Sequence, residues 1–160
     1  MKTVTGTTRI PCTPETFWKL FFDETYLKAL YLDGLGFKSF SVLEVTDTTR
    51  KTSCSPKINM PGMEKLIGDS FAYEEHGTLD KSRGVWTWRM VHPPGKKPMV
   101  SSHGTLRLAA EGEGSVRSDE VVIEAHMFGI GGMIEATAEK EVRAGWQKEL
   151  GFLETWLKKR

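Results

Sequence analysis

The chain of 160 residues has the size of one domain, and its 39% hydrophobic and 27% charged residues are ordinary for globular proteins, which excludes collagen, coiled coil and disorder. The 22 Lys and Arg against 21 Asp and Glu leave a net charge of +1, so no overall field favours nucleic acid or acidic membranes as partners. The N-terminus lacks the pattern of a signal peptide and no run of about 18 apolar residues is present, so we expect one soluble, cytoplasmic domain spanning residues 1–160.

The N-terminal part predicts a strand followed by two short helices. Residues 3–11 are rich in threonine and predict the strand, which ends at Pro11. Thr13 then supplies an N-cap and Pro14 a proline at the first helical position, and Asp23 caps a second short helix that ends before Gly34.

From residue 37 the pattern changes to a period of two, which is typical of strands. The predicted strands are 37–45, 49–55, 70–76, 85–91, 99–110 and 116–127. The breaks between them carry turn residues, including 77–80, 93–95 and 111–114, and they are too short for crossover helices. The sheet should therefore be antiparallel, with seven strands in all.

The segment 131–157 predicts a long amphipathic helix. Its apolar residues recur every three or four positions: Ile134, Ala138, Val142, Trp146, Leu150, Leu153 and Leu157. At 1.5 Å per residue this helix spans roughly 40 Å, which is enough to cross a whole sheet. Its apolar stripe requires a partner surface.

This order of elements resembles the START/polyketide-cyclase-like (SRPBCC, Bet v 1-like) superfamily, and its nearest likeness is to an uncharacterised bacterial branch. The local stretches that carry the resemblance are 13–18, 104–108, 131–135 and 60–63. The resemblance implies an α+β helix-grip fold, in which a curved seven-stranded antiparallel sheet wraps around the C-terminal helix. It also implies an apolar cavity between sheet and helix that is used for lipids, sterols, polyketides or hormones, and in some branches for catalysis.

The residues themselves give an independent reason to expect an apolar face on this sheet. Trp86, Trp88 and Met90 share one side of their strand, as do Leu106 and Leu108 on the next. Such a face either fills with side chains or leaves a pocket, and both tryptophans are also consistent with simple core packing. The predicted ligand-binding residues are Phe71, Tyr73, Trp86, Trp88, Met90, Leu106, Leu108, Ile123, Ala125, Met127, Met133 and Ile134.

Two further features suggest enzymatic activity or a route by which a ligand enters the cavity. Tyr73 and Glu75 share one side of their strand, so an inward Glu75 would be a general base in a greasy pocket, whereas a solvated Glu75 near the strand end is the simpler interpretation. The apolar loop 58–68 suggests a gate formed by Met60, Pro61, Met63 and Leu66, which could touch a membrane transiently; a satellite cluster packed under the loop is the alternative.

Other candidate sites are weaker. The four histidines His76, His92, His103 and His126 lack metal-ligand spacing, and we expect them to be exposed rather than metal ligands. Ser102 and His103 point to opposite faces of a strand and cannot form a catalytic pair. Gly129, Gly131 and Gly132 suggest a tight turn rather than an anion site, and Cys12 and Cys54 suggest inert buried thiols.

The sequence thus predicts a non-enzymatic binder or carrier of a hydrophobic small molecule such as a lipid, sterol or polyketide-like compound, with no metal or cofactor, acting as a monomer or weak homodimer. One alternative is a polyketide cyclase, aromatase or dehydratase that uses Glu75 and Tyr73. A second is a protein-interaction module with a solid core.

Overall fold

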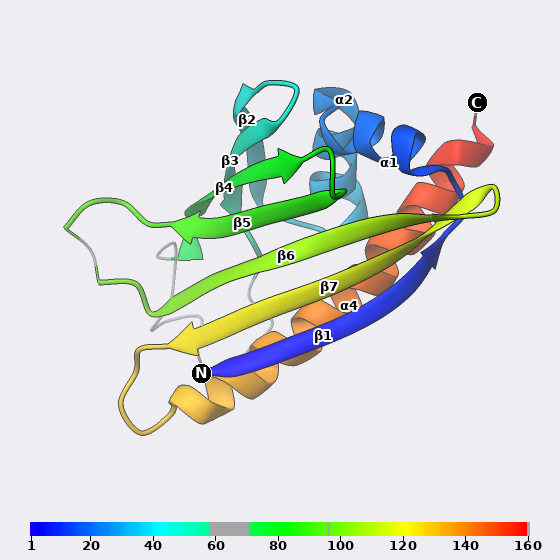
Figure 1. The fold of residues 1–160 in the computed structure, drawn as a ribbon. Helices are drawn as coiled ribbons and strands as arrows, with labels where there is room; N and C mark the ends of the chain where they lie inside the picture. Colours follow the sequence, from blue (N-terminus) through cyan, green and yellow to red (C-terminus); the bar gives the residue numbers. More distant parts are fainter. Residues whose placement is uncertain (58–70, 96, 160) are drawn as a thin grey trace.

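The computed structural model describes residues 1–57, 71–95 and 97–159, which form one sheet and the helices that cover it (Figure 1). The elements in chain order are β1 (Lys2–Ile10), α1 (Pro14–Phe21), α2 (Glu24–Ala29), η1 (Leu30–Gly34), β2 (Ser39–Val45), β3 (Thr49–Ser55), β4 (Tyr73–Asp80), β5 (Val85–Val91), β6 (Val100–Glu111), β7 (Gly114–Ala125) and α4 (Gly131–Lys158). This order confirms the predicted helix-grip fold.

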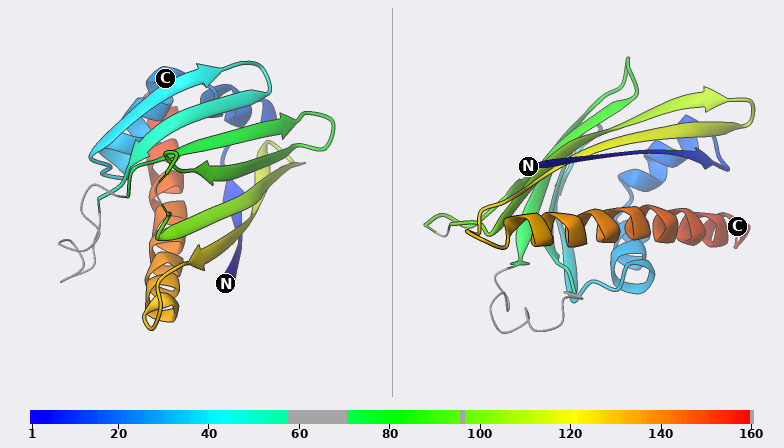
Figure 2. Two further views of the ribbon diagram at one scale, coloured as in Figure 1. Left: turned by 90° about the vertical axis from the view of Figure 1, so that its left-hand side faces the viewer. Right: turned by 90° about the horizontal axis from the view of Figure 1, so that it is seen from below.

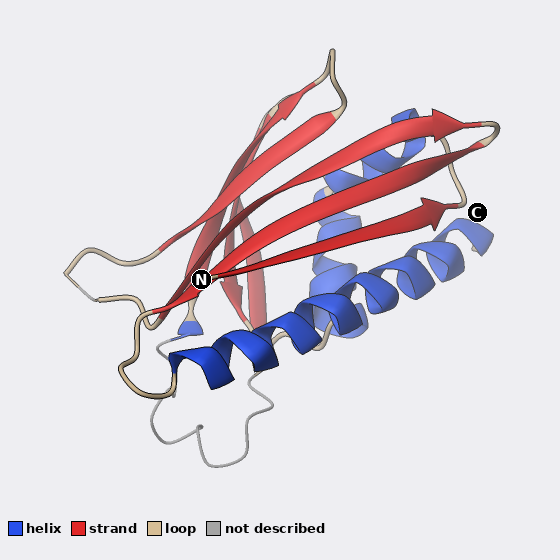
Figure 3. Cartoon of the chain, turned by 60° about the horizontal axis from the view of Figure 1, so that its bottom comes forward, coloured by secondary structure: helices blue, strands red, loops and turns tan. Residues whose placement is uncertain are grey.

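The seven strands pair antiparallel in the order β1-β7-β6-β5-β4-β3-β2. Strands β2 to β7 follow each other as a meander, and β1 closes the sheet beside β7. Helix α4 runs along one face of this twisted sheet, while α1 and α2 cover only the end of the sheet near the C-terminus (Figures 2 and 3). Within the described residues, the sheet and α4 therefore enclose the interior along its length, and α1 and α2 add to this enclosure only near the C-terminus (Figures 2 and 3).

The two short helices begin where the sequence predicts. The Thr13 hydroxyl accepts a hydrogen bond from the Thr16 N–H at 3.3 Å, and the Asp23 carboxylate accepts one from the Tyr26 N–H at 3.1 Å. Each cap satisfies a backbone donor that the first helical turn leaves free. The second helix continues into one turn of π-helix, η1, in which the Leu35 N–H donates to the Leu30 carbonyl.

Helix α4 carries the predicted apolar stripe toward the sheet, but the stripe is unevenly buried. Ile134 and Leu153, toward the two ends of the helix, are buried. Ala138, Val142 and Trp146 between them are only half-buried. Side chains of the sheet therefore do not fully cover the middle of the helix. Among the described residues, no helix combines the length and the apolar character that crossing a bilayer requires.

Strand β4 departs from the sequence prediction, because it extends through residues 77–80, which we expected to form a turn. The turn follows at residues 81–84 and ends in Gly84, whose φ is +66°. Gly77 is instead a site of close approach, since the indole ring of Trp86 occupies the space where a Cβ would lie. Predicted strand residue Ser70 lies outside the described residues.

The end of the interior beneath α1 is tightly packed. Trp86 is 1% exposed, and its ring meets Phe21 and Phe22 edge-to-face at centroid distances of 5.1 and 5.7 Å. Leu108 from β6 and Leu153 from α4 join the same buried cluster. Edge-to-face ring contacts add to the stabilisation that area burial gives. This cluster anchors the two short helices and the C-terminal half of α4 to the sheet.

Candidate functional site

Two adjacent cavities lie between the sheet and α4. The larger has a volume of about 310 Å³ and the smaller a volume of about 130 Å³. Six residues line both cavities and form what we call the junction: Tyr31, Glu75, Trp88, Val121, Trp146 and Glu149.

The larger cavity has mainly apolar walls. The sheet contributes Met90, Val100 and Ile123, and α4 contributes Ile134, Ala138 and Val142. These residues come from positions that alternate along the strands and recur every three or four residues along the helix, so they face each other across the space. An apolar wall of this kind favours an apolar occupant over water.

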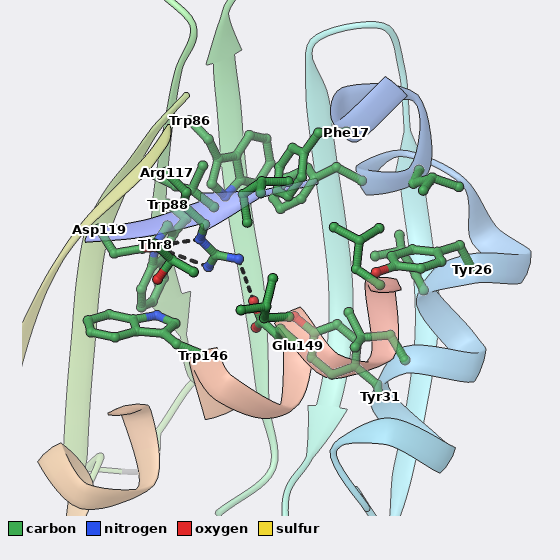
Figure 4. A pocket seen from close by; sticks show the side chains of 18 of the residues that line it. Thr8, Phe17, Tyr26, Tyr31, Trp86, Trp88, Arg117, Asp119, Trp146 and Glu149 are labelled. Carbon is green, nitrogen blue, oxygen red and sulfur yellow. Dashed lines mark hydrogen bonds and ion pairs between the residues drawn. The ribbon is translucent and has the colours of Figure 1, made fainter. Parts of the chain in front are cut away.

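The smaller cavity, by contrast, contains a buried ion-pair cluster (Figure 4). Arg117 on β7 donates from Nε and Nη2 to both carboxylate oxygens of Asp119, at 2.7 and 3.0 Å, and from Nη1 to Glu149 Oε2 on α4 at 2.6 Å. Burial alone would lower the pKa of Arg117, but the carboxylates of Glu149 and Asp119 raise it above its ordinary value. Burial raises the pKa of Asp119, although Arg117 opposes this shift. The cluster ties the helix to the sheet.

A second buried guanidinium, Arg50 on β3, lies across the same cavity. Its Nη2 donates to Glu75 Oε1 at 2.9 Å, and its Nη1 donates to the Phe21 carbonyl at 2.8 Å. The guanidinium carbon lies 4.0 Å from the centroid of the Phe21 ring and 5.1 Å from that of Trp86. Arg50 is only 2% exposed, so aromatic rings cover it.

Tyr31 from η1 completes the polar part of the junction. Its ring stacks on Phe40 at a centroid distance of 4.2 Å, which fixes the side chain. Burial raises the pKa of Tyr31 well above its ordinary value, and the negative charge of Glu75 adds to the shift. Its hydroxyl therefore stays neutral and able to donate a hydrogen bond.

Many of the residues predicted to contact a ligand line one of these cavities. Those in the lining are Phe71, Tyr73, Trp86, Trp88, Met90, Leu106, Ile123 and Ile134. Their contact with a ligand remains a prediction.

The other four predicted residues do not belong to either lining as the structure describes it. Leu108 is buried in the packed cluster below α1 instead. Ala125 and Met127 lie where β7 ends and pack beside the first turns of α4. Met133 is 54% exposed, because the first turn of α4 directs it outward.

The structure corrects the simpler interpretation of Glu75 as a solvated residue. Its side chain is 14% exposed and lies on the cavity side of β4. Glu75 is not an isolated acid in an apolar pocket either, because Arg50 donates a hydrogen bond to one of its carboxylate oxygens. Tyr73 lies beside it in the larger cavity, and burial raises the pKa of its hydroxyl well above the ordinary value.

Sequence reasoning missed Arg50, Arg117, Asp119 and Glu149. The signal for two of them was present: Asp119 and Arg117 lie two and four residues before Val121, on the strand face already assigned to the interior. Arg50 likewise alternates with the buried Thr52 and Cys54. Glu149 precedes the apolar stripe residue Leu150, and a helical pattern alone does not distinguish it from the exposed acids of α4.

The histidines and cysteines do not form a site of their own. Among the described residues, no group of His, Cys, Asp and Glu is arranged to hold a metal ion. His103 and His126 are exposed, whereas His76 and His92 are half-buried. Cys12 and Cys54 are free and buried, and burial raises the pKa of the Cys54 thiol to about 12, as expected for an unreactive thiol.

The predicted gate residues Met60, Pro61, Met63 and Leu66 lie outside the described residues.

Solved structures of other proteins share this architecture. The protein TTHA0849 from Thermus thermophilus superposes with a TM-score of 0.69 at 18% identity, covering 96% of this chain and 95% of that one. A STAR-related lipid transfer protein from Xanthomonas axonopodis gives a TM-score of 0.68 at 16% identity, covering 95% of this chain and 85% of that one. The Zhui aromatase/cyclase from Streptomyces sp. R1128 gives a TM-score of 0.66 at 16% identity, covering 96% of this chain and 93% of that one.

These likenesses show the fold: the chain has the helix-grip fold that its sequence suggested. The sequence also matches, over residues 5–157, the family described as "Protein of unknown function (DUF2505)", and the chain belongs to that family. No curated protein matches the sequence significantly.

Proposed function

We propose that this protein binds and carries a small, largely apolar molecule in the larger cavity between the sheet and α4. The observation that carries the proposal is the unfilled volume of about 310 Å³ with walls such as Met90, Ile123 and Val142. Well-packed interiors leave few voids larger than a water molecule, so a space of this size is unusual for a solid core. It lies at the lower end of the range, about 300–1,000 Å³, that is typical of ligand pockets.

The volume limits the size of the ligand. A volume of about 310 Å³ suits one compact molecule with a ring or a short chain. The apolar walls favour a hydrophobic body, and the junction offers polar contacts to one end of it. The ligand should therefore lie with its polar end toward Glu75 and Glu149.

The names of the structural neighbours support an apolar ligand. One is a lipid transfer protein and another an aromatase/cyclase, so the same fold is associated with hydrophobic small molecules in other chains. At 16% identity these names do not select a ligand for this chain. The finer expectations, a cytoplasmic location and a monomeric or weakly dimeric state, stay predictions.

Binding is favoured over cyclase chemistry by the state of the candidate base. A general base needs a carboxylate free to take a proton from the substrate, whereas Arg50 Nη2 already donates to Oε1 of Glu75 at 2.9 Å. A carrier needs only the cavity. The catalytic alternative stays open to test, since it predicts that Glu75→Gln abolishes turnover of a poly-ketone substrate without abolishing its binding.

The test fills the cavity and measures binding of a neutral probe, 2-(1-naphthyl)ethanol, by isothermal titration calorimetry. Ala138 lines the larger cavity from α4, so Ala138→Phe places a ring in the space and should weaken binding at least tenfold. Ala144 is exposed on the same helix, and Ala144→Phe is the matched control that should bind like the original protein. Equal binding by both variants, or no binding by the original protein, would contradict the proposal.

A further inference from the structure

The junction between the two cavities combines aromatic and acidic side chains. Tyr31, Trp88 and Trp146 supply aromatic rings, and Glu75 and Glu149 supply carboxylates. Trp146 lies directly over Gly6 of β1, where any Cβ would collide with the indole ring, so the ring is held against the sheet. Figure 4 shows Trp146 and Glu149 on α4 below Arg117 and Asp119 on the sheet.

The acidic groups are the members of the ion pairs that a ligand can reach. The side chains of Glu75 and Glu149 are 14% and 25% exposed, although both line the interior. Their cationic partners are more fully covered, with Arg50 at 2% and Arg117 at 10%. Arg50 and Arg117 line only the smaller cavity, so a molecule in the larger cavity meets the carboxylates of Glu75 and Glu149 at the junction rather than the guanidinium groups.

The charges of this cluster do not balance. Among the described residues, the smaller cavity is lined by three carboxylates, those of Glu75, Asp119 and Glu149, and by the two guanidinium groups of Arg50 and Arg117. From the described part of the chain, the larger cavity adds the exposed Lys57 and Glu141, which are of opposite sign. A surplus carboxylate in an apolar interior is costly unless a proton or a cation neutralises it.

We propose that the bound molecule carries a protonated amine, which lies at the junction beside the aromatic rings of Trp88, Trp146 and Tyr31 and contacts Glu75 and Glu149. This inference rests on the proposed function and names its ligand class: a small apolar body with one cationic amine. Ring faces attract cations through their quadrupole, and ionised carboxylates make charge-assisted hydrogen bonds to N–H donors. The amine supplies the positive charge that the cluster lacks.

Two other interpretations of the junction make different predictions. A proton on one carboxylate would also balance the charge, and the site would then take a neutral hydroxyl as well as an amine. An anionic ligand held by Arg50 would require that guanidinium to be accessible, whereas Phe21 and Trp86 cover it.

The experiment compares three probes of nearly equal shape on the full chain by calorimetry at pH 7: 2-(1-naphthyl)ethylamine, 2-(1-naphthyl)ethanol and 1-naphthylacetate. The amine should bind at least tenfold more tightly than the alcohol, and the carboxylate should bind most weakly. Glu149→Gln removes the surplus charge while Asp119 still holds Arg117, so it should reduce the preference for the amine over the alcohol to threefold or less. Glu154→Gln, an exposed change on the same helix, should keep the full preference.

The outcomes separate this inference from the proposed function. Equal affinity for amine and alcohol in the original protein, or an unchanged preference in Glu149→Gln, overturns the amine proposal and leaves the apolar binder intact. Tightest binding of 1-naphthylacetate overturns it as well. Failure of all three probes to bind overturns both proposals together.

Discussion

The two ends of the interior use the same strands and the same long helix, but they are filled differently. Below α1, the rings of Phe21 and Phe22 close around Trp86, and Leu153 of α4 is buried. Toward the N-terminal half of α4, the sheet faces the small and half-buried Ala138 and Val142. Among the described residues, no second helix covers this end. The larger cavity thus lies where no described residue of α1 or α2 lines the space, whereas only the smaller cavity remains beside the rings of α1.

The largest expected effect comes from removing the central ring of the packed end. Trp86→Ala should lower the free energy of unfolding by about 3–5 kcal/mol, because it removes a buried ring that packs edge-to-face against Phe21 and Phe22. Met90→Ala, on the same strand and face but lining the larger cavity, should cost less than about 2 kcal/mol, since Met90 already borders empty space. Urea denaturation measures both. Equal losses would mean that the two ends are packed alike.

The buried ion pairs should matter nearly as much as the packed rings. Arg117→Met leaves Asp119 and Glu149 without their cation and should lower the free energy of unfolding by about 3–5 kcal/mol. Arg143, whose 3.3 Å pair with Glu139 is exposed, provides the matched control, and Arg143→Met should cost about 1 kcal/mol or less. A small loss in Arg117→Met would contradict the role assigned to the cluster in joining α4 to the sheet.

Glycine substitutions sharpen the comparison at a smaller scale. Gly77→Ala forces the Trp86 ring to move and should cost about 1–3 kcal/mol. Gly151 on α4 has open space around it, so Gly151→Ala should instead add about 0.5–1 kcal/mol through better helix propensity. Thermal unfolding followed by circular dichroism distinguishes the two signs. Stabilisation by Gly77→Ala would show that the ring is not held where the structure places it.

The smallest effect concerns pH. Burial lowers the pKa of His92 below its ordinary value, and the nearby His126 contributes to the shift. The folded state thus binds its proton less readily than the unfolded chain. Stability from neutral His92 is complete above the unfolded pKa of about 6.5 and is lost as the pH falls from there toward the folded value. His92→Gln should therefore flatten the decline in unfolding free energy between about pH 7 and 5. If the unfolding free energy of the variant depended on pH as that of the original protein does, His92 would be excluded as a cause of the decline.

Much of the fold was readable from the sequence because its signals are local. The caps Thr13 and Asp23, the period of two in the strands and the stripe of α4 each follow from neighbouring residues. The error at 77–80 has a non-local cause: Gly77 makes room for Trp86, a partner known only once β4 and β5 are paired.

The candidate site was only partly readable for the same reason. Its apolar walls follow from alternation, but the pairing of Arg117 with Glu149 joins residues 32 positions apart, and that of Arg50 with Glu75 joins residues 25 apart. Such partners meet through strand register and helix placement. The alternation of a strand can place a charged residue on the inward face, but it does not show which residue pairs with that charge.

The most direct test of the central claim locates a bound molecule by nuclear magnetic resonance. With 2-(1-naphthyl)ethanol bound to methyl-labelled protein, nuclear Overhauser effects should connect the naphthyl ring to the methyl groups of Ile123 and Val142, on opposite walls of the larger cavity. Contacts confined to exposed methyl groups such as those of Leu43, with none to Ile123 or Val142, would contradict the account.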